Sequence, residues 1–290
     1  MANTIALAKN YTSILDEVYK KASVTTDLTS DNSMVRAGAN ANEIVYPQIS
    51  VSGLGDYDRN SGYTNSSVNL EWKTATFNYD RGTKISVDVM DNEESRDIAF
   101  TMAGSELMRT KVAPEADAFV FATLAGKTGI SKATPATYAD ATAFLTALIE
   151  AKNTMDEDEV PEEGRILYAT PTLLNGVMAL DTTKSREVLA TFYNTVKVPQ
   201  SRFYTAIDLL DGKSSGEEAG HYTKASTGKD INFMIVHKPA VIKFDKHTAS
   251  DIIPASANAN ADADISKYRK YGIVDVYDNK TAGIYLSHKA

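Results

Sequence analysis

The chain of 290 residues contains no cysteine. Structural disulfides, thiolate catalysis and cysteine-ligated zinc are therefore excluded. No stretch approaches the roughly 18 consecutive apolar residues that a membrane-spanning helix needs. The first residues also lack the basic leader and uninterrupted apolar run of a signal peptide. We therefore expect a soluble protein that is made inside a cell.

Positive charge is scarce as well. The sequence has 30 lysines and arginines against 38 aspartates and glutamates, a formal net charge of −8. The basic residues do not form the stripe that is typical of proteins that bind nucleic-acid phosphates. Residues 150–163 hold seven acidic side chains and one lysine, which we interpret as a solvated loop after a helix. The alternative, a cation site, lacks the D-x-D-x-D-G spacing of a calcium loop.

Sequence motifs for catalysis are also missing. The four histidines show no metal-ligand spacing, and G-x-G-x-x-G does not occur. The stretch GKSSG at 212–216 fits G-x-S-x-G by letter, but it lies in a polar segment that we interpret as an exposed loop and not as the nucleophile turn of a hydrolase. Two fragments, at 126–128 and 212–214, end like a phosphate-binding loop but lack its earlier glycine. We therefore predict no catalytic, cofactor-binding or metal-binding residues, and no enzyme. An enzyme with scattered carboxylates stays an alternative, since glycosidase-type acids leave no local motif.

The first 42 residues are predicted to form an arm. Residues 4–22 place apolar side chains at mixed three- and four-residue spacing, which indicates an amphipathic helix. Residues 23–42 are rich in Ser, Thr, Asn and Asp and indicate an extended connector. The apolar stripe of the predicted helix consists of Ile5, Leu7, Ala8, Tyr11, Ile14, Leu15, Val18 and Tyr19.

Two strand-like segments follow, around residues 43–51 and 68–76, with the polar stretch 52–67 between them. They predict an extended β-hairpin with a flexible tip. An isolated hairpin is marginal in water, and its open edges invite pairing with another chain. We expect a neighbouring copy to supply the missing contacts. The alternative is a hairpin that folds back on its own domain.

The remaining pattern mixes helices and strands. A long helix is expected from Ile98 to Leu124, with a kink or restart at Pro114, which lacks a backbone donor. A second helix is expected from Thr137, a short strand at 165–169, a helix from Pro171 and two strands within 232–244. Residues 271–287 predict a terminal hairpin with its turn at 278–281. The fold class expected from this order is α+β.

Four segments, taken in order, carry a resemblance. They are ISVDVMDNEESRD at 85–97, VAPEADAFVFATLAG at 112–126, RILYATPTLLNGV at 165–177 and YRKYGIVDVYDNKTAGIYL at 268–286. With the arm and the hairpin before them, the chain resembles the major capsid proteins of tailed bacteriophages, whose fold is named after phage Hong Kong 97. The same fold builds encapsulin compartments, so an encapsulin-like shell stays an alternative.

The resemblance implies five parts. These are an N-terminal arm (1–42), an extended β-hairpin loop (43–80), a peripheral domain with a spine helix (81–129), an axial domain (130–240) and C-terminal strands of both domains (241–290). It implies a chain that assembles with itself into pentamers and hexamers, forming an icosahedral head shell around the phage genome.

The implied partners are a portal and a separate scaffolding protein, with DNA enclosed without sequence-specific binding, no membrane and no cofactor. The implied location is the virion, after synthesis in the bacterial host cytoplasm. The assembly contacts that we expect are Ile14, Tyr19, Tyr57, Arg59, Tyr63 and Trp72.

Overall fold

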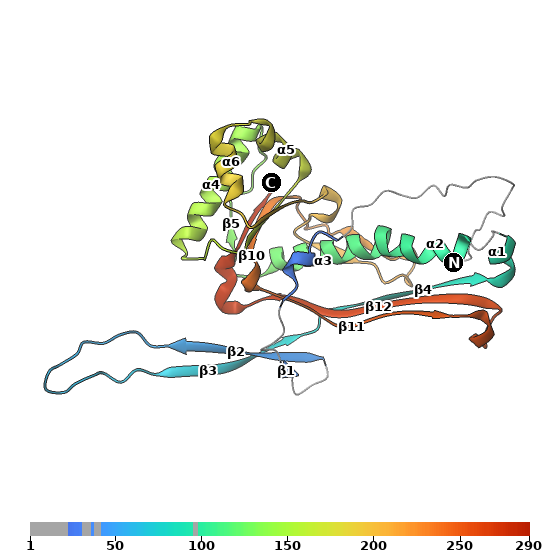
Figure 1. Ribbon diagram of the computed structural model, residues 1–290, viewed down its shortest axis with the longest axis horizontal. Helices are drawn as coiled ribbons and strands as arrows, with labels where there is room; N and C mark the ends of the chain where they lie inside the picture. Colours follow the sequence, from blue (N-terminus) through green and yellow to red (C-terminus); the bar gives the residue numbers. More distant parts are fainter. Residues whose placement is uncertain (1–22, 31–35, 38–41, 95–97) are drawn as a thin grey trace.

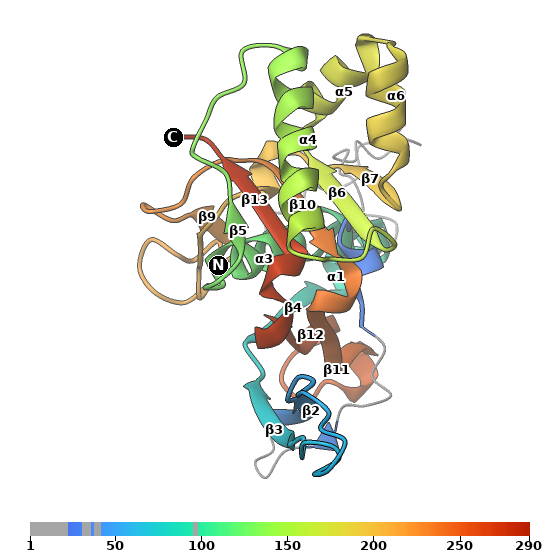
Figure 2. The same cartoon turned by 90° about the vertical axis from the view of Figure 1, so that its left-hand side faces the viewer.

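The computed structural model describes residues 23–30, 36–37, 42–94 and 98–290. The described residues contain a five-stranded sheet, two three-stranded sheets and a two-stranded ribbon. The predicted helix at 4–22 and residues 31–35 and 38–41 of the connector lie outside these residues. In Figure 2 the helices of the five-stranded layer and the β2–β3 hairpin lie at opposite ends of the molecule, with the long strands between them.

The five-stranded sheet has the order β5 (Ser131–Lys132), β13 (Ile284–His288), β10 (Ile231–His237), β6 (Arg165–Ala169) and β7 (Asn194–Lys197). Every residue of β6 and β10 is buried. Because both faces of these strands are covered, their sequences are almost continuously apolar instead of alternating.

Helices cover both faces of this sheet. Leu167 and Phe233 pack under α4 (Ala141–Glu157) and α5 (Pro171–Ala179), with α6 (Thr183–Ala190) beside them. Their strand neighbours Ile166, Tyr168 and Met234 point the other way and pack on α3 (Ala113–Gly126). Side chains alternate between the faces of a strand, so consecutive residues of RILYA serve two separate cores.

A long three-stranded sheet lies beneath α3 (Figure 1). Its order is β11 (Val241–Ile253), β12 (Ala263–Val276) and β4 (Tyr79–Asp88), all antiparallel. Its inner face carries Val274, which packs with α3. Its outer face carries Ile242 and Ile273, which pack against the root of the hairpin.

The long helix is interrupted before Pro114. It comprises α1 (Val89–Glu94), α2 (Ile98–Leu107), one wide π-helical turn over Met108–Val112, and α3. Pro114 stands in the first turn of α3, where a missing N–H costs nothing. The structure therefore departs from a regular α-helix directly before the residue where the sequence predicts a kink or restart.

The hairpin consists of β2 (Glu43–Val51) and β3 (Val68–Thr76), paired from Glu43–Thr76 to Val51–Val68. It projects from the end of the long sheet (Figure 1). The short strand β1 (Arg36–Ala37) flanks β2 near its start, and β8 (Ile207–Leu209) and β9 (Tyr222–Lys224) form the separate ribbon. Short 3₁₀ turns lie at Thr26–Leu28, Gln200–Arg202, Lys238–Ala240, Ala255–Ala257 and Asp278–Gly283.

Three sequence predictions need correction. The terminal hairpin is wrong, because β12 pairs with β11 and β4 whereas β13 pairs with β10 and β5. The second helix starts at Ala141, not near Thr137, and Asp140 is its N-cap, accepting the N–H of Ala143 at 2.8 Å. The acidic run is only half loop, since α4 continues to Glu157.

Candidate assembly surfaces

The two faces of the hairpin differ in what covers them. Residues directly opposite each other in an antiparallel pair lie on the same face. Ile44, Tyr46 and Ala75 form the root face, which is buried against Ile242 and Ile273 of the long sheet. The other face points away from that sheet, and its exposed apolar side chains are Ile49, Val51, Val68, Leu70 and Trp72. These five residues are called the apolar face below.

The apolar face is open to solvent. Ile49 is 62% exposed, Val68 is 65% exposed and Leu70 is 55% exposed. Of the thirteen large hydrophobic side chains that are exposed in the described residues, eight lie in the hairpin and its tip. A contiguous exposed apolar patch marks an interaction site more often than a free surface.

Part of the hairpin tip, residues 58–62, is a hydrogen-bonded turn, and the flexibility that the sequence predicts for the tip stays a prediction. The Asp58 carboxylate accepts the N–H groups of Asn60 and Ser61 at 2.7 and 2.8 Å. These bonds lower the pKa of Asp58. The backbone of Asp58 pairs with that of Gly62, whose φ of +79° suits glycine. The turn therefore holds its exposed aromatic side chains in a defined arrangement.

The structure places four of the six predicted contact residues on this hairpin. Tyr57 and Tyr63 pack ring to ring at the tip, with centroids 4.8 Å apart, and both are exposed. Arg59 is exposed in the same turn, and Trp72 belongs to the apolar face.

The other two predicted contacts, Ile14 and Tyr19, lie outside the described residues. Sequence reasoning missed Ile49 and Leu70, although the alternation of apolar residues in both strands was the available signal.

A buried carboxylate fixes the point where the N-terminal arm leaves the body. Asp117 of α3 is fully buried and accepts the hydroxyl of Ser23 at 2.7 Å and the N–H groups of Val24 and Thr25. It also pairs with Arg202 at 2.9 Å. Val24 and Leu28 pack into the core beside α3. Residues 23–30 are therefore anchored on the inner face of the long sheet.

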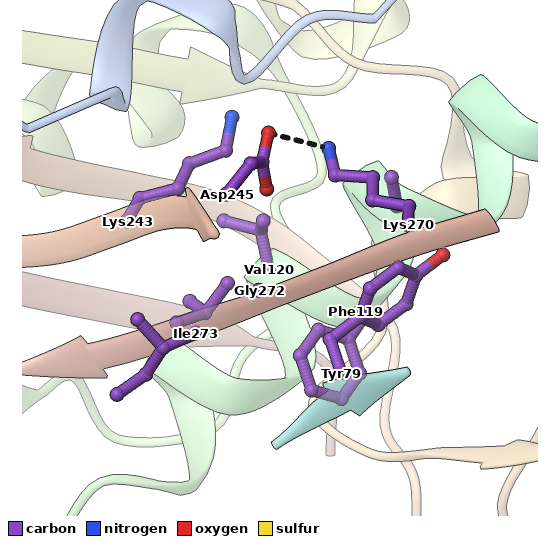
Figure 3. Close-up of a pocket in the computed structure, with 10 residues that line it drawn as sticks. Tyr79, Phe119, Val120, Lys243, Asp245, Lys270, Gly272 and Ile273 are labelled. Atoms are coloured by element: carbon purple, nitrogen blue, oxygen red, sulfur yellow. Dashed lines mark ion pairs between the residues drawn. The ribbon is translucent and has the colours of Figure 1, made fainter. Parts of the chain in front are cut away.

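Lys243 of β11 holds the same segment from the sheet side. Its ammonium donates to the carbonyl oxygen of Thr25 at 2.5 Å. Burial, together with the nearby charge of Lys270, lowers the pKa of Lys243 to about 8. Figure 3 shows Lys243 beside the Asp245–Lys270 ion pair, whose charged atoms are 3.0 Å apart. The cavity here is about 20 Å³, which holds no more than a water molecule.

A second buried carboxylate fastens the loop 210–221 to the long sheet. Glu115 of α3 accepts the guanidinium of Arg81 at 2.6 Å and lies 3.5 Å from Nδ1 of His221. Arg81 also donates to the carbonyl oxygens of Leu210 and His221. Burial raises the pKa of Glu115, but the bonds from His221 and Arg81 outweigh it and hold the pKa below its usual value. We call Arg81, Glu115 and His221 the clasp.

Solved structures with this architecture come from phage capsids. No family model matches the chain, and no curated protein does. The mature capsid of bacteriophage PhiM1 matches with a TM-score of 0.68 at 14% identity, over 98% of this chain and 92% of the other. The capsid of cyanophage P-SCSP1u matches with a TM-score of 0.64 at 15% identity, over 98% and 93%. The chain has the phage capsid fold. A virus-like particle from Pyrococcus furiosus matches less fully, with a TM-score of 0.52 at 11% identity, over 83% and 86%.

The two fragments that end like a phosphate-binding loop, at 126–128 and 212–214, bind carboxylates of the same chain. In the fragment at 212–214, the backbone N–H groups of Lys213 and Ser214 donate to the carboxylate of Asp211. The hydroxyl and N–H of Ser214 lower the pKa of Asp211 to about 2. In the other fragment, Lys127 pairs with Asp275 and Asp278.

Two further observations concern ligands and membranes. Within residues 23–30, 36–37, 42–94 and 98–290, no cluster of three histidine or carboxylate side chains could hold a metal ion. A groove of about 430 Å³ lies between β4, α3 and the loop 210–221. Of the charged residues that line it, Arg81 and Glu115 are paired with each other, and the others are Lys111, Asp211, Lys213 and Glu218. No helix in the described part of the chain is long and apolar enough to cross a membrane.

Proposed function

We propose that this chain is the major capsid protein of a tailed bacteriophage, which assembles with itself into the icosahedral head shell that encloses the genome. The observation that carries the proposal is the exposed apolar face of the hairpin on a chain with the phage capsid fold. A monomer leaves this face in water, whereas a neighbouring copy would bury it.

The energetics favour a closed shell over a simple pair. Completing the burial of five half-exposed apolar side chains stabilises a contact by about 5 kcal/mol, at about 1 kcal/mol each. Association itself costs about 4–15 kcal/mol in lost freedom and ordering. One hairpin contact therefore offsets only the lowest of these costs. Repeated contacts within closed symmetry make the sum favourable.

The parts of the chain take the following roles in this proposal. The axial domain (130–240) clusters around five-fold and six-fold axes as pentamers and hexamers, and the peripheral domain (81–129) lies around three-fold positions. The arm (1–42) and the hairpin loop (43–80) reach neighbouring copies, and the C-terminal strands (241–290) complete both domains. A portal and a separate scaffolding protein are the proposed partners.

The charge and the comparisons support a genome-enclosing shell. A net charge of −8 suits a wall that must not grip packed DNA. The two phage capsids match over 98% of this chain, against 83% for the virus-like particle. We therefore favour a virion component, made in the host cytoplasm, over an encapsulin-like compartment and over an enzyme.

Two neighbouring residues on β3 provide a matched test. Leu70 lies on the apolar face, and Asn69 lies on the opposite face, and both are exposed. In Leu70→Asp, a carboxylate would be buried in the contact without a partner, which is costly. We expect Leu70→Asp to stay a folded subunit that forms no closed particles. Asn69→Asp adds the same charge and should assemble normally.

Negative-stain microscopy and sedimentation measure assembly, and circular dichroism checks the fold of both variants. Normal shells from Leu70→Asp would refute the assembly role of the apolar face. Loss of shells in both variants would show that any charge on the hairpin disrupts assembly, which also contradicts a face-specific contact.

A further inference from the structure

The loop 210–221 joins β8 to β9 and forms one wall of the groove that lies between it, β4 and α3. The clasp fastens this loop to the body, and one member of the clasp is a histidine. We infer that the loop is a pH-sensitive latch, which protonated His221 fastens on Glu115 in mildly acidic solution and which loosens when His221 loses its proton. The inference goes beyond the proposed function, because it concerns a movement within one subunit.

Arg81 holds both ends of the loop on β4. Its guanidinium donates to the carbonyl oxygens of Leu210 and His221 at 2.8 and 3.2 Å. The N–H of Leu210 donates to the same carbonyl oxygen of His221 at 2.9 Å, which closes the neck of the loop. These contacts join an arginine and backbone groups, whose charges do not change between pH 5 and 8. The side-chain contact of His221 is therefore the part of the clasp that responds to pH in this range.

The closed loop has a backbone conformation that depends on outside contacts. His221 has a φ of +73°, and Gly212 and Gly220 have φ of +71° and +60°. Glycine adopts positive φ readily, whereas histidine does so at a cost. Such a residue keeps this conformation when surrounding contacts hold it there. We therefore expect the loop to open more often when one of those contacts weakens.

The ring of His221 lies against charged and aromatic groups from several elements. Its Nδ1 atom is buried and lies 3.5 Å from Oε2 of Glu115, and no other polar atom in the described part of the chain is a hydrogen-bond partner for it. The ring packs edge-on with that of Tyr222, with centroids 4.5 Å apart. Arg81 and Tyr79 donate to the same Glu115 carboxylate. The other charged or titratable side chains that line the groove are Lys111, Asp211, Lys213, Glu218 and Tyr268.

Among these groups, the histidine is the one that changes its charge near neutral pH. Side chains of the other types ordinarily keep their charge between pH 5 and 8, whereas histidine ordinarily changes it there. Burial raises the pKa of Glu115, but His221 and Arg81 hold it below its usual value, so the carboxylate stays ionised across this range. With a protonated ring the contact joins opposite charges, and charge-assisted hydrogen bonds are about twice as strong as neutral ones. The latch is therefore tightest in mildly acidic solution and loosens as the pH rises through neutrality.

Hydrogen exchange of the full-length chain at pH 5.5 and 7.5 tests this inference. The rates are corrected for the intrinsic effect of pH on amide exchange, and residues 207–224, the loop with its two strands, are compared with β6 and β10. We expect the corrected exchange of residues 207–224 to be about ten-fold faster at pH 7.5, as the loss of one charge-assisted hydrogen bond predicts. The amides of β6 and β10 should show no such change. Equal corrected rates in residues 207–224 at both pH values would overturn the inference.

Two histidine variants show whether His221 is responsible. Asparagine tolerates positive φ and carries no charge at either pH, so His221→Asn should exchange at the native pH 7.5 rate under both conditions. His247→Asn is the matched control, because His247 is exposed on β11, and it should keep the native pH difference. A native pH difference that persists in His221→Asn would contradict the role of this histidine.

Glu115→Gln provides a second variant in case His221→Asn fails to fold, which circular dichroism detects. It leaves His221 in place and removes the charge that its ring faces, so the pH difference in residues 207–224 should disappear. A full pH difference in Glu115→Gln would also refute the latch. None of these outcomes depends on particle formation, so the proposed function is tested separately.

Discussion

Replacement of Asp117 by alanine tests whether one buried carboxylate controls the docking of the arm. The carboxylate accepts hydrogen bonds from Ser23, Val24 and Thr25 and pairs with Arg202 at 2.9 Å. The Asp117 side chain is 0% exposed and that of Arg202 is 3% exposed. Asp117→Ala removes all of these contacts at once while leaving the surface of the molecule unchanged.

The magnitude follows from these contacts. Removing one partner of a buried ion pair destabilises a protein by about 3–5 kcal/mol. If residues 23–30 stay docked, the N–H groups of Val24 and Thr25 also lose their acceptor, at about 1–3 kcal/mol each. Burial of Val24 and Leu28 opposes release by about 1.5–3 kcal/mol each. The two lost hydrogen bonds offset most of this burial, so we expect the segment to open more easily than in the native chain and before the body unfolds.

Hydrogen exchange of the amides in residues 23–30 is the decisive assay. A shift of about 3 kcal/mol corresponds to roughly 100-fold faster exchange through local opening. The amides of β6 and β10 should change less, because the core of the five-stranded sheet is not touched. Protection of residues 23–30 equal to that of the native chain would refute the anchoring role of Asp117. The double variant Asp117→Leu, Arg202→Met serves as the control and should recover much of the lost stability, since it removes both charges.

Two predictions concern pH. The pKa of Lys243 is lowered to about 8 from an ordinary 10.5. Between these two pH values the unfolded chain therefore binds more protons than the folded chain. The free energy of unfolding should rise with pH in this range, by at most about 3 kcal/mol. Urea unfolding of the subunit at pH 8 and 9.5 should show this rise, and Lys243→Met should flatten it; an equal rise in the variant contradicts the assignment. The pKa of Glu115 is held below its usual value, so the clasp stabilises above that value and is lost as pH falls through the folded pKa. Glu115→Gln should lower the free energy of unfolding by about 1.5–3 kcal/mol at pH 7. The difference in this free energy between the variant and the native chain should shrink near pH 3. A difference that stays constant with pH would show that the charge of Glu115 does not contribute.

Local sequence patterns predict those parts of the fold that depend on neighbouring residues alone. The alternation in residues 43–51 and 68–76 predicts the paired strands β2 and β3, and the missing donor of Pro114 predicts the restart of the helix. The terminal strands show the limit. Residues 271–287 contain two strands and a turn, but β12 pairs with β11 and β4, and this pairing depends on partners elsewhere in the chain.

The buried carboxylates could not be identified from the sequence for a related reason. Glu115 and Asp117 follow Pro114 and stand at a helix start, where acidic residues are favourable without any tertiary partner. Their actual partners, Arg81 and Arg202, are 34 and 85 residues away. Nothing local distinguishes an acid that faces solvent from one that joins two distant segments.

Along the hairpin, the apolar residues lie on one face near its root and on the opposite face further out. At its root, β2 directs Ile44 and Tyr46 toward the long sheet. Further out, the same face carries Gln48 and Ser50, and the apolar residues change to the opposite face. The apolar set of a strand stays on one face when a single core covers it, so the change indicates two different partners. The first is the body of the same chain, and the second, in the proposed function, is a neighbouring copy.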